Sequence, residues 1–148
     1  MKESEQTTFC LLHRVCYGDT DAGGVVYNGD YLRFFEMARN EMCRARGILL
    51  PEFIRDGVAF AVREAQVRYH LPALFDDLLR IEVTCRRDRA SSILFDYKVT
   101  VQERDGHPHL HPDTAVVTGS TQVVCCRVGL DGRSMRPIRI PKAFTALF

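Results

Sequence analysis

Two carboxylates and a pair of glycines lie close together near the start of the chain. They are Asp19, Asp21, Gly23 and Gly24, within the sequence YGDTDAGGVVYN. Paired glycines allow a tight turn or a close approach to a ligand, because they carry no Cβ. A carboxylate can attack an electrophilic carbon or take a proton from water. Beside a site that stabilises an oxyanion, such a carboxylate is the equipment of a hydrolase.

A helix that follows this loop can supply the oxyanion site. Apolar residues recur at steps of three and four, at Tyr31, Phe34, Phe35, Ala38, Met42 and Ala45. This spacing predicts one buried helical face. Asn28 or Asp30 can cap the start of the helix, and Gly47 can end it. The N–H groups and the partial positive charge at the helix start favour a developing anion.

The remainder of the chain favours strands. We expect them at residues 9–17, 58–69, 79–87, 92–103 and 114–128, with a connection at 48–57 that can hold a helical turn. Because strands and helices do not alternate, the sheet should be antiparallel. Gly119 predicts a bulge or bend in the last strand. The free edge of such a sheet predicts pairing into a dimer at least.

Length and composition limit the function classes. The chain has 148 residues and a formal net charge of +1, so we expect one domain (1–148) without the bulk charge of a nucleic-acid binder. No apolar run is long enough to span a bilayer. The polar residues 1–8 predict a flexible tail and no secretory signal, and we expect a cytoplasmic protein. Six scattered cysteines without metal-ligand spacing indicate reduced, mostly buried thiols.

The run YGDTDAGGVVY, followed by Tyr31, the Phe34-Phe35-Glu36 run and Arg39, resembles the acyl-CoA thioesterases of the 4-hydroxybenzoyl-CoA thioesterase family. Its motif is most similar to the branch associated with the Tol-Pal system. The resemblance implies an α+β hotdog fold, in which a long antiparallel sheet wraps one central helix. It also implies hydrolysis of a short-chain or aromatic acyl-CoA, or of an acyl-carrier-protein thioester, by a homodimer or homotetramer. Neither a metal nor another cofactor is implied, since CoA enters with the substrate.

The same resemblance places the catalytic carboxylate at Asp21, as nucleophile or general base. A turn aspartate bonded to its own loop is the alternative role, and we expect a structural role for Asp19. Backbone N–H groups near Asn28 would form the oxyanion site, with Gly24 in contact with substrate. Tyr27 either contacts substrate in the acyl pocket or packs within the fold. The related branch usually carries histidine where this chain has Asn28, and asparagine cannot act as an acid or base. Asn28 then either caps the helix or contacts substrate.

The phosphates of CoA predict positive charge near the mouth of the site. By resemblance, the turn with Arg89 and Ser91 meets the nucleotide, and arginines of the C-terminal tail are further candidates. Glu36 is expected in a surface ion pair on the helix, and Glu64 on a solvent or interface face of its strand. The histidines at 107, 109 and 111 are a weak metal-ligand set, because prolines interrupt them.

Two other functions compete with thioester hydrolysis. One is a non-catalytic module that binds acyl-CoA, which would bind without turnover. The other is a hotdog enoyl-CoA hydratase or dehydratase, which requires a histidine close to the carboxylate. His13 precedes Asp21, and the next histidine is His70. The sequence therefore favours the thioesterase.

Overall fold

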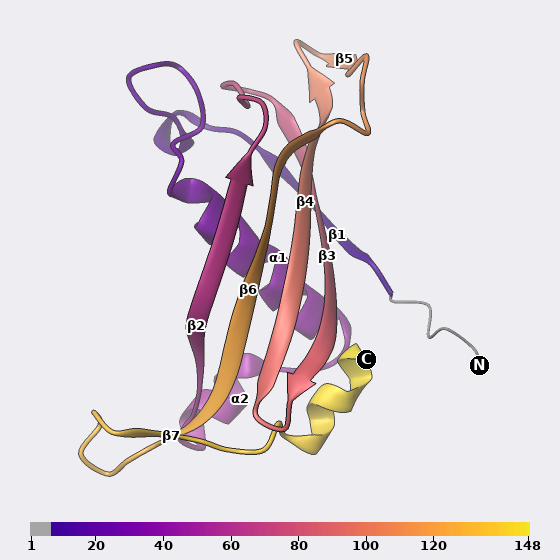
Figure 1. Cartoon of the computed structure of the whole chain (residues 1–148). Coiled ribbons are helices and arrows are strands. Elements are labelled where there is room, and N and C mark those ends of the chain that lie inside the picture. The colour runs from indigo at the N-terminus through magenta and orange to yellow at the C-terminus, as the bar shows by residue number, and fades with distance from the viewer. Residues whose placement is uncertain (1–6) are drawn as a thin grey trace.

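One antiparallel sheet of seven strands dominates the fold, and one long helix packs across it (Figure 1). The computed structural model describes residues 7–148, so most of the tail predicted at residues 1–8 lies outside the described residues. The strands follow one another across the sheet in the order β1 (Phe9–Arg14), β3 (Leu78–Arg89), β4 (Ser92–Arg104), β6 (Ala115–Val128) and β2 (Val58–Tyr69). Two short strands, β5 (His107–Pro108) and β7 (Met135–Pro137), pair with β4 and β6. Every ladder is antiparallel, which confirms the predicted fold class.

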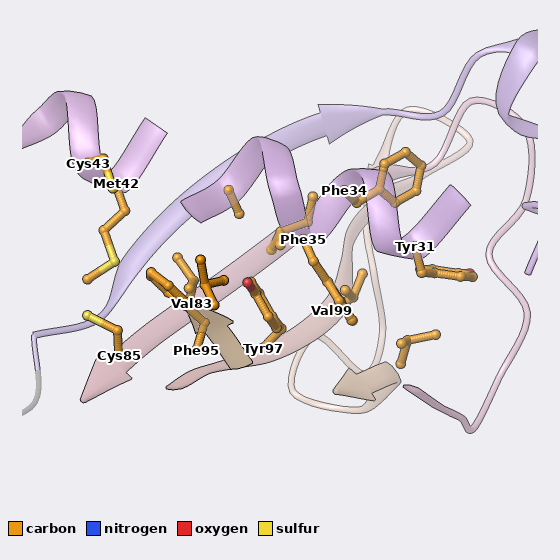
Figure 2. Close-up of a cluster of buried hydrophobic side chains, with 14 of the residues drawn as sticks. Tyr31, Phe34, Phe35, Met42, Cys43, Val83, Cys85, Phe95, Tyr97 and Val99 are labelled. Atoms are coloured by element: carbon orange, nitrogen blue, oxygen red, sulfur yellow. The ribbon is translucent and has the colours of Figure 1, made fainter. Parts of the chain in front are cut away.

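The central helix α1 (Asp30–Ala45) buries its apolar face against the sheet. Figure 2 shows its side chains opposite those of β3 and β4, at Tyr31, Phe34, Phe35, Met42, Val83, Phe95 and Tyr97. The rings of Phe35 and Tyr97 stack at 4.1 Å. All but one of the predicted face residues are buried. Ala45 is exposed, and Cys43 is buried instead, because Leu50 of α2 (Leu50–Arg55) and Phe144 close over the cysteine.

The sequence predicted the C-terminal end of α1 correctly but not the residue that caps its N-terminal end. Gly29 is the N-cap residue and no side chain caps the helix there, so the predicted capping by Asn28 or Asp30 is wrong. The C-terminal end is confirmed. Gly47 has φ +74° and donates its N–H to the Arg44 carbonyl at 3.0 Å. A left-handed residue after a helix requires a glycine most often, since other residues meet steric strain there.

Gly119 lies in regular pairing with both neighbouring strands, so the predicted bulge is wrong. The irregularity between β2 and β6 lies at Val62–Glu64 instead. A Cβ at Gly119 would come within 2.6 Å of both the Phe35 ring and the Gln66 carbonyl oxygen. The glycine therefore allows the helix to approach the sheet closely.

The strand β2 forms one edge of the sheet. Its second half was predicted to bury one face, but Ala65 and Tyr69 are exposed and Val67 is half-buried. Tyr69 pairs with buried Val117, so the two side chains lie on the face that α1 covers elsewhere. Leu32 of α1 and Val62 of β2 are also exposed, so apolar side chains remain uncovered on the helix and on the edge strand.

The C-terminal segment packs more closely than its basic, proline-rich sequence indicates. After β7 it forms the 3₁₀ helix η2 (Lys142–Leu147), whose Phe144 and Leu147 are buried. Phe144 contacts the rings of Phe53 and Phe60, each at 5.2 Å. Within residues 7–148, no helix has both the length and the hydrophobicity needed to cross a bilayer.

Candidate active site

The loop that carries Asp21 is a small hairpin. Thr20 and Val26 form an antiparallel bridge at its base, and the Asp21 N–H donates to the Val25 carbonyl at 2.9 Å. The Gly24 N–H donates back to the Asp21 carbonyl at 3.0 Å, with Gly24 at φ +77°. A tight turn followed by a left-handed residue is a common hairpin loop that favours glycine at this position. The turn leaves Asp21 exposed.

The carboxylate of Asp21 is bonded on one side only. Its Oδ1 accepts the Gly23 N–H at 2.8 Å, which is the loop-stabilising role expected of a turn aspartate. No donor within residues 7–148 bonds to Oδ2 of Asp21. The loop thus fixes the side chain and leaves one carboxylate oxygen available for chemistry.

Asp21 and the start of α1 share a cleft of about 360 Å³. Its walls come from the hairpin, the first turn of α1 and the residues that follow β2: Asp21, Val25, Val26, Asn28, Tyr31, Tyr69, His70, Leu71 and Pro72. The walls are mainly apolar, with few polar groups, as in many small-molecule sites. The structure therefore brings the two predicted catalytic residues, Asp21 and Asn28, to one cavity.

Backbone donors lie at the helix end of this cleft. The Asp30 N–H donates to the Tyr27 carbonyl at 3.0 Å, and the Leu32 N–H donates to the Gly29 carbonyl at 3.3 Å. The N–H groups of Asn28 and Gly29 have no acceptor among the described residues. They precede a helix of 16 residues, whose dipole favours negative charge at this end.

Asp19 has a different environment from Asp21, since it is only 1% exposed. Its carboxylate bonds to Arg33, to His13 Nε2 at 2.7 Å, and to the N–H and thiol of Cys16 at 3.0 and 3.3 Å. Burial alone raises the pKa of Asp19, but the bonds from Cys16, His13 and Arg33 outweigh it and lower the pKa to about 2. Asp19 is therefore a buried, fully bonded anion, in agreement with its expected structural role.

The other predicted contacts lie outside the cleft in one copy of the chain. Gly24 forms the hairpin turn, and the half-exposed Tyr27 has its ring against Gly29, where a Cβ would come within 2.8 Å of it. Arg89 and Ser91 lie at the hairpin between β3 and β4, at the opposite end of the sheet from the Asp21 loop (Figure 1).

Two tyrosines line the cleft without having been predicted there. Burial raises the pKa of Tyr31 to about 12, so this phenol stays protonated. Its ring meets the Tyr69 ring edge to face at 5.8 Å, and the Tyr69 hydroxyl donates to the Asn28 carbonyl at 2.8 Å. The inward alternation of β2 indicated the face of Tyr69, but no sequence pattern indicated its contact with the helix start.

Glu36 and Glu64 lie outside the cleft, whereas His70 lines it. The carboxylate of the exposed Glu36 lies 4.0 Å from the Arg39 guanidinium, as predicted. Glu64 is exposed on β2, also as predicted, and accepts a hydrogen bond from Gln66 at 3.0 Å. His70 lines the cleft, but its Nε2 lies 2.9 Å from the Thr118 hydroxyl. This contact engages one ring nitrogen of His70 with a side chain of β6.

Across residues 7–148, no group of three or more His, Cys, Asp or Glu side chains is arranged to hold a metal ion. His107, His109 and His111, which follow β4, are therefore not arranged as a metal site. His109 Nδ1 accepts the backbone N–H of His111 at 3.3 Å, a local loop contact.

Comparison with known proteins assigns the chain to a family. A family model described as the thioesterase-like superfamily matches residues 15–148. The chain belongs to this family. The acyl-CoA thioester hydrolase YbgC of Escherichia coli O6:H1 is 36% identical to it over 135 residues, which cover 91% of each chain. The acyl-CoA thioesterase YbgC of Haemophilus influenzae is 34% identical over 136 residues, covering 91% of this chain and 90% of that one.

Solved structures confirm the hotdog fold. A 1,4-dihydroxy-2-naphthoyl-CoA thioesterase from Synechocystis superposes with a TM-score of 0.79 at 24% identity, over 95% of this chain and 96% of that one. A mutant 4-hydroxybenzoyl CoA thioesterase bound to 4-hydroxybenzoyl CoA superposes with a TM-score of 0.80 at 19% identity, over 95% of each chain. At these identities the likeness concerns the fold alone.

Proposed function

We propose that this member of the thioesterase-like family hydrolyses an acyl-CoA to the free acid and CoA. The observation that carries the proposal is the cleft that Asp21 and Asn28 line together, with one carboxylate oxygen of Asp21 left unbonded and the N–H of Asn28 without an acceptor among the described residues. The similarity to two acyl-CoA thioesterases over nine-tenths of the chain supports the substrate class. We propose a short-chain or aromatic acyl group as the substrate. The apolar side chains of Val25, Val26 and Tyr31 line the cleft and can contact such a group.

Asp21 can act in two ways. As a nucleophile, its Oδ2 attacks the thioester carbon, the C–S bond breaks, and water then hydrolyses the mixed anhydride. As a general base, it takes a proton from the water that attacks the same carbon. In either route the carbonyl oxygen gains negative charge, which the N–H groups of Asn28 and Gly29 would stabilise. Removal of one such donor typically lowers the rate about 10²–10³-fold.

Asn28 contributes a side chain as well as a backbone donor. Because it does not cap α1, we assign its amide to contact with substrate. The histidine-dependent hydratase alternative has no support from the described histidines near the loop. His13 is engaged by buried Asp19, and the ring of His70 is directed to Thr118.

We also propose that the enzyme is a homodimer joined at β2. A second copy would cover the open edge of the sheet and the exposed apolar side chains of Leu32, Val62 and Tyr69. A two-fold axis pairs the two β2 strands antiparallel, so the start of one lies opposite the end of the other. The cleft of each copy would then lie at the same end of the dimer as the β3–β4 hairpin of the other copy.

This pairing gives a role to the residues expected to meet the nucleotide. Arg89 and Ser91 are distant from the cleft of their own copy. In the antiparallel dimer they lie at the end of the sheet nearer to the cleft of the other copy, where they can meet the phosphates of CoA. The same arrangement would admit the pantetheine arm of an acyl-carrier-protein thioester.

The test is turnover of a panel of acyl-CoAs with short aliphatic, long aliphatic and aromatic acyl groups. CoA release should be followed by chromatography, because accessible cysteines of the protein itself, such as the exposed Cys16, would react with a thiol reagent. Turnover of at least one class supports the proposal and names the acyl group. Saturable binding without turnover would instead support a non-catalytic acyl-CoA-binding module.

A further inference from the structure

Asp19 ties three segments of the chain together at one buried carboxylate. His13 reaches it from β1, Cys16 from the residues after β1, and Arg33 from the second turn of α1. The 3₁₀ turn η1 (Tyr17–Asp19) directly precedes the Asp21 hairpin. No other buried carboxylate within residues 7–148 joins β1 to α1.

The backbone of Asp19 joins the 3₁₀ turn before the hairpin to the residue that follows it. Its N–H donates to the Cys16 carbonyl at 3.0 Å, and its carbonyl accepts the Tyr27 N–H at 2.8 Å. Asp21 follows two residues after Asp19, and the Asn28 N–H follows directly after Tyr27. The position of Asp19 relative to α1 therefore determines where the Asp21 carboxylate lies relative to the backbone N–H of Asn28.

Arg33 is the part of this cluster that comes from the helix. Its guanidinium bonds to Asp19 and, at 3.2 Å, to Asp30 in the first turn of α1. It also lies over the Phe34 ring, 5.3 Å from the centroid. These neighbours direct the side chain toward Asp19, although half of Arg33 remains exposed.

We propose that the Arg33–Asp19 ion pair is a positioning pair for the proposed thioesterase. It holds the Asp21 hairpin and the start of α1 at the separation that the reaction requires, and neither residue lines the cleft. The inference rests on the proposed function, because its effect is on the reaction of Asp21. Misplacement of reacting groups by about 1 Å can lower a rate about a hundredfold.

A pair that only stabilised the fold would give a different result. Loss of Arg33 leaves Asp19 bonded to His13 and Cys16, so the protein should still fold. A purely stabilising role would lower the free energy of unfolding and leave kcat unchanged at temperatures well below Tm. A role in substrate binding would raise KM alone.

The experiment compares Arg33→Ala and Arg33→Lys with the control Arg44→Ala. Arg44 forms an ion pair with Glu41 at 3.4 Å on the same helix, in its last turn. We expect Arg33→Ala to lower kcat about tenfold to a hundredfold with little change in KM. Arg33→Lys should restore part of the loss, because the charge persists while the planar fork is lost. Arg44→Ala should leave kcat unchanged.

Hydrogen exchange of residues 20–29 supplies a readout that does not need turnover. Faster exchange of the Tyr27 amide in Arg33→Ala, but not in Arg44→Ala, supports the positioning role. Unchanged exchange or unchanged kcat in Arg33→Ala overturns it. If the wild type hydrolyses no acyl-CoA, the proposed function fails, and the exchange result still decides whether Arg33 positions the loop.

Discussion

Replacement of Gly119 by alanine tests how closely α1 approaches the sheet. The added Cβ would lie 2.6 Å from the Phe35 ring and 2.6 Å from the Gln66 carbonyl oxygen, both well inside contact distance. Neither neighbour can move freely, since Phe35 is fully buried and stacked on Tyr97, and Gln66 lies in β2. Overpacking of this kind costs about 1–3 kcal/mol of stability.

Urea unfolding of Gly119→Ala, Phe35→Leu and the double variant measures this contact. Phe35→Leu alone should cost about 1–2 kcal/mol through lost packing and stacking. The double variant should be more stable than the sum predicts by about 0.5 kcal/mol or more, because leucine relieves the ring clash. The relief should be partial, since the Gln66 oxygen remains.

The control is Gly18→Ala, where the nearest atom to an added Cβ is the Cys16 sulfur at 4.0 Å. Its free energy of unfolding should stay within about 0.5 kcal/mol of the wild type. A Gly119→Ala variant as stable as the wild type would refute the close approach. Strict additivity in the double variant would show that Phe35 is not the residue that the Cβ meets.

Three further predictions concern the site and the interface. The pKa of Asp19 lies at about 2, below its ordinary 3.8, so its ionisation stabilises the fold above about pH 4, and this stability is lost as the pH falls toward 2. Asp19→Asn should therefore have a lower free energy of unfolding in urea than the wild type at pH 4, and this difference should shrink by roughly 2 kcal/mol by pH 2. Asn28→Ala should keep its free energy of unfolding within about 0.5 kcal/mol of the wild type and lower kcat/KM, whereas a loss of about 1 kcal/mol would restore the capping role. Val62→Asp, at an exposed position of the edge strand β2, should sediment with the mass of one chain, whereas Leu110→Asp in the loop after β5 should remain a dimer. If both variants sediment as dimers, pairing at β2 is contradicted.

The elements that depend on local pattern could be predicted from the sequence. The period of Tyr31, Phe34 and Phe35 gave the buried face of α1, and residues 58–69 are β2 without any change of bounds. The four inward residues predicted for residues 79–87 are all buried: Leu79, Ile81, Val83 and Cys85. Such patterns depend only on which face of a single helix or strand is buried, and the predicted faces are buried in the fold.

The features that depend on two distant segments could not be predicted in this way. Gly119 carries the same signal for a bulge as for a close approach, and only the position of Phe35 decides between them. Asn28 could cap a helix by its type, but the helix begins after Gly29. Tyr69 enters the cleft because its hydroxyl reaches a carbonyl 41 residues earlier in the chain.

The central claim is that Asp21 carries out the hydrolysis, and its most direct test is kcat/KM of Asp21→Asn against wild type on the best acyl-CoA. Asp56→Asn is the matched control, because Asp56 is an exposed aspartate outside the cleft. We predict that Asp21→Asn loses about 10³-fold or more, with unchanged stability, while Asp56→Asn keeps wild-type activity. Turnover that survives in Asp21→Asn would contradict the account and move the search to Glu36.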